Sequence, residues 1–215
     1  TYNLERERGI TIFSKQAEFE LGNRGITLLD TPGHVDFSAE MERTLQVLDY
    51  AILVINGADG VQGHTMTLWR LLARYQIPTF LFINKMDQDG TDKEKLLAEL
   101  KKRLSDNCVD FTWGKSDLQS QFLEDISVCD EELLEKYLET EEISTADIQK
   151  VIRERKLFPC FFGSALKMTG VEEFLHGLEK YCETPTYPSE FGAKVFKIAR
   201  DDQGNRLSYM KITGG

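Results

Sequence analysis

The sequence predicts an α/β fold built on a parallel sheet, followed by the beginning of a second, β-rich domain. Short runs of apolar residues, typical of strands buried on both faces of a parallel sheet, recur at 51–55, 78–83 and 157–162. Segments with helical spacing of apolar residues lie between these runs. A Thr-Pro-Thr-Tyr-Pro stretch at 184–188 interrupts the alternation and is typical of a linker.

The first fifty residues predict a hairpin followed by a helix. Apolar residues alternate with polar ones over 10–21, and 26–29 is the expected return strand. The Gly-Asn-Arg-Gly stretch at 22–25 is typical of the turn between them. Helical spacing then runs from Asp36 to Leu48.

Helices are expected to connect the buried strands farther along the chain. Their predicted ranges are 62–75, 93–104, 133–138, 146–155 and 171–181. This alternation indicates βαβ units, in which helices join parallel strands. Residues 105–125 show no clear pattern. Two strands at 193–198 and 207–212 predict a second antiparallel hairpin, which is marginally stable alone and therefore fits the start of a larger β domain.

The composition excludes several classes of protein. Apolar residues make up 41% of the chain, as in globular proteins. The longest apolar runs are far shorter than the ~20 residues that cross a bilayer. The chain begins without Met and without an export leader, so we expect a cytoplasmic fragment of a longer protein that has no membrane partner. The four cysteines form no CxxC pair and the three histidines are scattered, which argues against a zinc site.

The net charge of −10 is concentrated in one segment. Residues 124–147 hold ten acidic residues and one basic residue, whereas the rest of the chain is nearly neutral. An acidic chain argues against a general nucleic-acid surface and against sequence-specific DNA binding. The simplest interpretation of the acidic segment is a solvated helical face.

Four short stretches lie at or beside the ends of predicted strands, where ligands bind in doubly wound sheets. They are Arg8–Ile12, Asp30–His34, Asn84–Asp87 and Gly163–Leu166. An aspartate at a strand end can hold magnesium through water, and a threonine hydroxyl can bind the same ion. A glycine lets a backbone amide approach a phosphate. Each stretch alone is more typical of a turn or an exposed strand. Only the order and spacing of all four make the pattern specific enough to indicate a function.

The Asn-Lys-Met-Asp stretch has the chemistry to select guanine. The carboxylate of Asp87 can accept two hydrogen bonds side by side, and guanine offers such a pair from N1–H and its 2-amino group. Adenine has no such pair, so the wrong base leaves an acceptor unpaired. The Asn84 amide can serve purine acceptors, and the Lys85 stem can lie along the ring. Small residues at 163–165 allow a backbone N–H to reach a base oxygen.

Together, the four stretches resemble the signature of translational GTPases of the elongation factor G superfamily. They include ERERGITI at 5–12, DTPGHVDF at 30–37, NKMD at 84–87 and GSAL at 163–166, and the resemblance covers nearly the whole chain. Within the superfamily, the stretches LDYAILVI at 48–55, FINKMDQDG at 82–90 and GAKVFKI at 192–198 are most similar to tetracycline-resistance ribosomal protection proteins.

The resemblance implies a domain organisation. Residues 1–183 would form a P-loop-NTPase-type, GTP-binding G domain that lacks its N-terminal strand, P-loop and first helix. An acidic insertion would occupy about 105–155. Residues 184–190 would be a linker, and 191–215 the truncated start of a β-barrel domain II.

The resemblance also implies roles for individual residues, with GTP or GDP and Mg2+ as cofactors. Thr11 would bind Mg2+ and the γ-phosphate, and Asp30 would hold Mg2+ through water. His34 would be the catalytic residue that positions the attacking water. The implied GTP-binding residues are Gly33, Asn84, Lys85, Asp87, Ser164, Ala165 and Leu166.

One departure from the family concerns the P-loop. The only Gly-Lys-Ser, at 114–116, has Val109 where the motif needs glycine, and no buried strand precedes it, so we interpret it as a loop. Backbone amides and a lysine of the P-loop supply much of the affinity for phosphate. We therefore expect these 215 residues alone to bind GTP weakly or not at all and to hydrolyse none measurably.

The predicted function is GTP binding and ribosome-stimulated GTP hydrolysis in translation, as in a tetracycline-resistance ribosomal protection factor. The implied partner is the ribosome, and a monomer is favoured. One alternative is elongation factor G, which drives translocation. An alternative of another class is a nucleotide-free binding module, in which the acidic segment 124–147 docks a basic partner.

Overall fold

The protein is described by a computed structural model that covers residues 15–31, 38–112, 119–201 and 203–215. It divides into two compact units. The larger unit is Tyr50–Glu183, and the smaller unit combines the residues before Tyr50 with Thr184–Gly215. Within the described ranges, no helix has the length and hydropathy needed to span a membrane.

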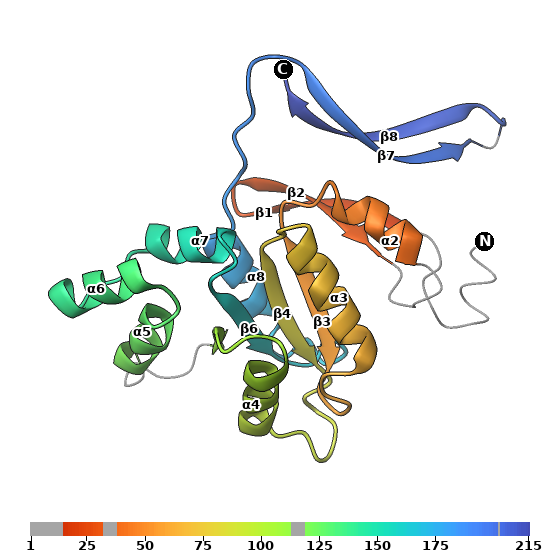
Figure 1. Cartoon of the computed structure of the whole chain (residues 1–215). Helices are drawn as coiled ribbons and strands as arrows, with labels where there is room; N and C mark the ends of the chain where they lie inside the picture. Colours follow the sequence, from red (N-terminus) through yellow and green to blue (C-terminus); the bar gives the residue numbers. More distant parts are fainter. Residues whose placement is uncertain (1–14, 32–37, 113–118, 202) are drawn as a thin grey trace. The chain divides into compact units, whose positions relative to one another are not determined.

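A four-stranded parallel sheet forms the centre of the larger unit (Figure 1). Its strands are β3 (Ala51–Asn56), β4 (Thr79–Asn84), β5 (Cys108–Asp110) and β6 (Phe158–Phe162). The strand order is β3-β4-β6-β5, and every neighbouring pair is parallel. The prediction of an α/β fold with a parallel sheet is therefore confirmed.

The strands of this sheet differ in burial. The two central strands, β4 and β6, are buried almost throughout, as predicted. β3 is the first strand of the sheet as described, and its Ile52 and Val54 are 37% and 58% exposed. The prediction that this run is buried on both faces is therefore wrong. Side chains alternate along a strand, and only the set containing Leu53 and Ile55 faces the core.

Three helices alternate with these strands, and their bounds agree with the predicted ones to within about one residue. They are α3 (Gly63–Arg74), α4 (Lys93–Arg103) and α8 (Val171–Tyr181). In α8, Phe174, Gly177 and Tyr181 are buried, which is the i, i+3, i+7 spacing of one helical face. This face packs into an aromatic core. Members of that core include Phe80, Phe82, Phe111, Phe161, Phe174 and Tyr181.

A cluster of three short helices is inserted between β5 and β6 (Figure 1). It consists of α5 (Gln119–Ser127), α6 (Glu131–Thr140) and α7 (Thr145–Arg153). Most of its acidic residues are exposed, whereas its buried residues are Ile126, Ser127, Leu133, Ile148, Val151 and Ile152. Lysines pair with several of the carboxylates, as in Lys136–Asp147 and Lys150–Glu132. This is the arrangement that the solvated-face interpretation predicts.

Two antiparallel hairpins and one helix make up the described part of the smaller unit. The first hairpin joins β1 (Lys15–Leu21) to β2 (Arg24–Asp30), and the second joins β7 (Gly192–Arg200) to β8 (Arg206–Gly214). The first turn is shorter than predicted, because Gly22 takes a φ of 58° and the return strand already begins at Arg24.

The helix of the smaller unit, α2 (Ser38–Leu45), ends three residues before the predicted Leu48. Backbone carbonyls just past its end accept hydrogen bonds from lysine ammonium groups rather than from further helical turns. Lys194 donates to Gln46 O at 3.0 Å, and Lys211 donates to Val47 O at 3.0 Å. The predicted strand residues 10–14, the start of the predicted helix at Asp36 and the Gly-Lys-Ser stretch at 114–116 lie outside the described residues. The prediction that no buried strand precedes that stretch is wrong, because Cys108 and Val109 of β5 are buried.

Ser144→Ala is expected to lower the free energy of unfolding by about 1 kcal/mol, because it removes a helix N-cap. Ser144 Oγ accepts from Asp147 N at 3.2 Å, and Asp147 Oδ2 accepts from Ser144 N at 2.8 Å, which together form a capping box at the start of α7. Urea unfolding of the 215-residue chain at pH 7 measures the loss. Ser120→Ala, at an exposed site in α5, serves as the control and should change stability by less than about 0.5 kcal/mol.

The same cap predicts a pH dependence. Burial alone would raise the pKa of Asp147, but hydrogen bonds from Lys136 and Ser144 outweigh it and lower the pKa to about 2. Because the unfolded carboxyl titrates near pH 4, the ionised Asp147 stabilises the fold fully above that pH. This stabilisation is lost as the pH falls from about 4 towards 2. An Asp147→Asn variant that lost stability in parallel with the parent over this range would contradict the assignment.

Candidate functional site

The described part of the candidate site lies where the two central strands end. Asn84 is the last residue of β4, and Gly163 directly follows β6. The strands are in parallel register, with Ile83 opposite Phe162, so the two loops begin side by side. Gly163 N donates to Ile83 O at 2.9 Å, and Met86 N donates to Gly163 O at 3.0 Å. The structure therefore brings the two predicted base-binding stretches together.

The side chain of Asn84 joins these two loops. Its Oδ1 accepts hydrogen bonds from Lys85 N at 2.8 Å and from Ala165 N at 2.9 Å. Lys85 itself has a φ of 64°, in the left-handed region that non-glycine residues seldom adopt. Sequence reasoning assigned the Asn84 amide to the base only, and it missed this bridging role of the carbonyl oxygen. The Nδ2 group is the part of Asn84 that can donate to a purine acceptor.

Asp87 presents an ionised carboxylate beside the second loop. A hydrogen bond from the Ser164 hydroxyl, followed by one from the Lys167 ammonium, lowers the pKa of Asp87 below its ordinary value. Lys167 Nζ lies 3.2 Å from Asp87 Oδ2, and the Asp87 side chain keeps 23% of its surface exposed. An ionised carboxylate only accepts hydrogen bonds, which suits the paired donors of guanine. Lys167 was missed from sequence, although it directly follows the Gly-Ser-Ala-Leu stretch.

The second loop folds back on itself into a tight turn. Ser164 N donates to Thr169 O at 2.9 Å, and Thr169 N donates to Ser164 O at 3.1 Å. Ser164 is buried, whereas Leu166 at the tip is 91% exposed. A Cβ atom on Gly163 would lie 2.2 Å from Thr169 O, so only glycine fits where the two chain segments approach. The loop is therefore closely packed where it leaves β6, and Leu166 at its tip points outward.

The remaining predicted site residues belong to the smaller unit or lie outside the described residues. Asp30 is the exposed last residue of β2, and β2 pairs with β1 in a separate two-stranded sheet. Thr11, Gly33 and His34 lie outside the described residues. Among the residues described, no group of three or more His, Cys, Asp or Glu side chains is placed to hold a metal ion.

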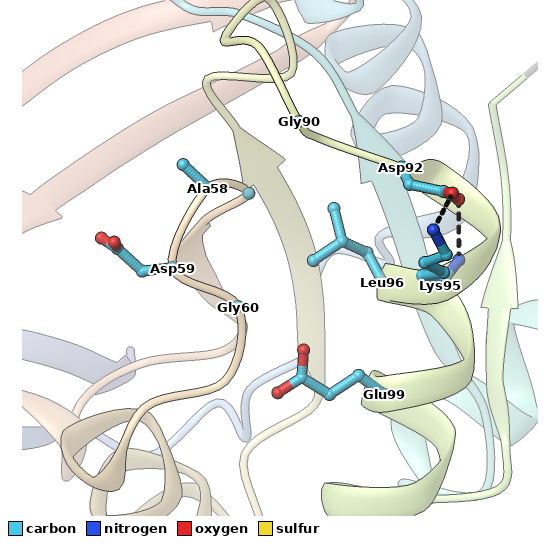
Figure 2. Close-up of a pocket in the computed structure, with 9 residues that line it drawn as sticks. Ala58, Asp59, Gly60, Gly90, Asp92, Lys95, Leu96 and Glu99 are labelled. Atoms are coloured by element: carbon cyan, nitrogen blue, oxygen red, sulfur yellow. Dashed lines mark hydrogen bonds and ion pairs between the residues drawn. The ribbon is translucent and has the colours of Figure 1, made fainter.

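A small pocket lies beyond the carboxyl end of β3, between the following loop and the start of α4 (Figure 2). Its volume is about 180 Å³, which is small for a nucleoside-sized ligand. The lining residues are Gly57, Ala58, Asp59, Gly60, Gly90, Asp92, Lys95, Leu96 and Glu99. Its charged groups already have partners, because Asp92 pairs with Lys95, Glu99 accepts from Val61 N at 3.2 Å, and Asp59 accepts from the Asn56 amide. We assign no ligand to it.

Comparison with known proteins identifies what the chain resembles. Residues 1–184 match the model of the elongation factor Tu GTP binding domain. Curated relatives include elongation factor G of Ureaplasma urealyticum serovar 10, which is 32% identical over 98% of this chain and 40% of the relative. Tetracycline resistance protein TetP of Clostridium perfringens is 36% identical over 99% of this chain and 36% of the relative. TetO of Streptococcus mutans is 34% identical over the whole chain and 36% of the relative.

The chain thus spans about two fifths of the length of these relatives. A crystal structure of a protein from Thermus thermophilus has a similar fold, with a TM-score of 0.84 and 22% sequence identity. The match covers 98% of this chain and 38% of that protein. At this identity the likeness concerns the fold alone.

Proposed function

The chain belongs to the elongation factor Tu GTP-binding domain family, and from this premise we propose that it is the guanine-nucleotide-binding part of a ribosome-stimulated GTPase that acts in translation. The observation that carries the proposal is the pair of hydrogen-bonded loops at the ends of β4 and β6, with the ionised Asp87 between them. Asp87 accepts from N1–H and the 2-amino group of guanine.

The rest of the base pocket is proposed on the same loops. The stem of Lys85 and the exposed Leu166 supply apolar surface for the faces of the base. Ala165 N is engaged by Asn84 Oδ1, so we assign the neighbouring backbone amide of Leu166 to the base oxygen. Ser164 supports the pocket through its hydroxyl, which holds the carboxylate of Asp87.

We assign the phosphate and metal roles to Thr11, Asp30, Gly33 and His34 by resemblance to the family. Asp30 fits Mg2+ chemically, since it is an exposed carboxylate at a strand end and Mg2+ prefers oxygen ligands. When bound, Mg2+ neutralises the charge that develops on the transferred phosphoryl group. Thr11 would complete the metal site, Gly33 would contact the γ-phosphate, and His34 would orient the attacking water.

The proposed domain organisation is a G domain at 1–183 with an acidic insertion at about 105–155, a linker at 184–190 and the start of domain II at 191–215. The boundary at 183 is supported by the division of the structure between Glu183 and Thr184, whereas the same division groups the residues before Tyr50 with Thr184–Gly215 rather than with Tyr50–Glu183. Support also comes from the β7–β8 hairpin, whose exposed apolar residues suit a strand pair within a larger barrel.

The test is GTP hydrolysis by the full-length gene product with and without ribosomes. We expect slow hydrolysis alone, at least tenfold acceleration by ribosomes, and no comparable use of ATP, because adenine lacks the paired donors that Asp87 requires. The 215-residue chain alone is the matched control and should show no measurable hydrolysis. Hydrolysis of ATP and GTP at equal rates, or no effect of ribosomes, would contradict the proposal.

Within this function, we propose a tetracycline-resistance ribosomal protection factor, with elongation factor G as the alternative. The relatives include both kinds of protein, at 32% to 36% identity. Expression of the full-length gene in a tetracycline-sensitive host separates them. A rise in the inhibitory concentration of tetracycline supports protection, whereas unchanged sensitivity together with stimulated translocation supports elongation factor G. Failure to bind GTP at all would favour a binding module that docks partners through 124–147.

A further inference from the structure

Lys93 makes two contacts at the edge of the sheet where the proposed guanine site lies. It is the first residue of α4, and its Nζ lies 2.6 Å from Asp110 Oδ2 at the end of β5. The same ammonium lies 5.3 Å from the centre of the Phe162 ring, at the end of β6. The side chains of Lys93 and Asp110 are 35% and 27% exposed, so water screens the pair only in part. One side chain therefore connects the start of a helix to the ends of two strands.

These contacts fall at the ends of both guanine-binding loops. The first loop is closed by Thr91, whose Oγ1 donates to Met86 O and to Gln88 O, both at 2.9 Å. Asp92 then caps α4 by accepting from Lys95 N, so the loop enters the helix in a defined conformation one residue before Lys93. The second loop begins at Gly163, which directly follows Phe162.

The same ion pair also reaches the start of the helical insertion. Asp110 Oδ1 accepts from Thr112 N at 2.9 Å, and Phe111 N donates to Cys160 O at 2.8 Å. The carboxylate that holds Lys93 therefore also sets the direction of the chain as it leaves β5. A shift of Asp110 would therefore move Lys93, and Lys93 would in turn move the end of the first loop.

We propose that Lys93 is a positioning residue for guanine recognition, which holds the Asp87 loop against the Ser164 loop by pairing with Asp110 beside the ring of Phe162. The inference rests on the proposed function, since it concerns the same site. Guanine needs both oxygens of Asp87 in one orientation, and a small change in that loop weakens two hydrogen bonds at once. Loss of the pair therefore acts on the 2-amino contact and not only on overall stability.

The test compares the binding of GDP and inosine diphosphate to the full-length gene product. Inosine diphosphate lacks the 2-amino group, so the dissociation constant of inosine diphosphate divided by that of GDP reports the contact with Asp87. Lys93→Met keeps the apolar stem and removes the charge, and we expect the ratio to fall about fivefold, as suits the loss of a partly exposed ion pair. Asp110→Asn should have the same effect, and the double variant should add little, because both changes break one interaction.

The insertion offers a matched control. Lys136 and Asp147 form an ion pair of the same 2.6 Å length, with side chains 45% and 24% exposed, on helices of the insertion. Lys136→Met should lower the unfolding midpoint but leave the ratio of the inosine diphosphate dissociation constant to that of GDP unchanged. Lys93→Arg keeps both the charge and the contact with the ring, so it should restore the ratio of the parent.

The outcomes separate the inference from the function on which it rests. A parent protein that binds both nucleotides equally overturns the proposed function, and the inference falls with it. A parent that prefers GDP, together with a Lys93→Met variant that keeps the full preference, overturns the inference alone. A fall in stability without a change in the ratio also overturns it, because that result assigns Lys93 a structural role only.

Discussion

Asp87→Asn is expected to lower the affinity of the full-length gene product for GDP about 100-fold and to raise its affinity for xanthosine diphosphate. Two charge-assisted hydrogen bonds to guanine are lost, and the new amide nitrogen faces the N1–H and 2-amino donors instead. Xanthine carries an oxygen where guanine carries the 2-amino group, so the amide of the variant can donate to it. Fluorescence titration with labelled GDP and xanthosine diphosphate measures both effects.

Asp89→Asn is the matched control for this prediction. It makes the same chemical change two residues farther along the loop, at a residue that is exposed. We expect it to leave both affinities within about twofold of the parent. Since hydrogen bonds from Ser164 and Lys167 lower the pKa of Asp87, the parent should keep its preference for guanine as the pH falls to the ordinary range of an aspartate, near 4. Equal weakening by the two variants would remove Asp87 from the base site.

The parts of the site that could be predicted from sequence follow from one property of parallel sheets. Strands that run in the same direction end at the same edge, so polar stretches after 78–83 and 157–162 had to meet. The register that places Ile83 opposite Phe162 fulfils this expectation. The contacts that refine the site could not be predicted in this way. Asn84 Oδ1 accepts a hydrogen bond from Ala165 N, and Lys93 pairs with Asp110. Both contacts join residues that are far apart in the sequence and that only the three-dimensional packing brings together.

Two features of the fold, the strand β5 and the exposed face of β3, could not be predicted from the sequence for other physical reasons. β5 has only three residues, Cys108–Asp110, which is too short to show a period of two, so the segment 105–125 gave no pattern. The run at 51–55 is apolar on both sides, and an apolar run does not reveal which side chains face the core. Ile52 and Val54 share one face of β3 and are exposed, whereas Leu53 and Ile55 on the other face are buried.

The second large effect concerns the core beneath the site. Phe161→Ala is expected to lower the free energy of unfolding by about 3–5 kcal/mol, the usual cost of emptying a buried aromatic position. Phe161 is 1% exposed, and its ring centre lies 5.2 Å from that of Phe174 and 6.0 Å from that of Phe111. A Cβ atom on Gly177 would lie 2.4 Å from its Cζ, so the ring packs directly on the backbone of α8.

Urea unfolding of the 215-residue chain, followed by circular dichroism, measures this loss without nucleotide. Leu138→Ala in α6 is the matched control, because it also shortens an apolar side chain on the larger unit but at a site that is 73% exposed. It should cost less than about 0.5 kcal/mol. Domains are commonly stable by only about 5–15 kcal/mol, so the Phe161 variant should lose a large share of its stability. A cost below about 1 kcal/mol would mean that the sheet and α8 repack around the gap, and that the loop after β6 does not depend on this aromatic core for its support.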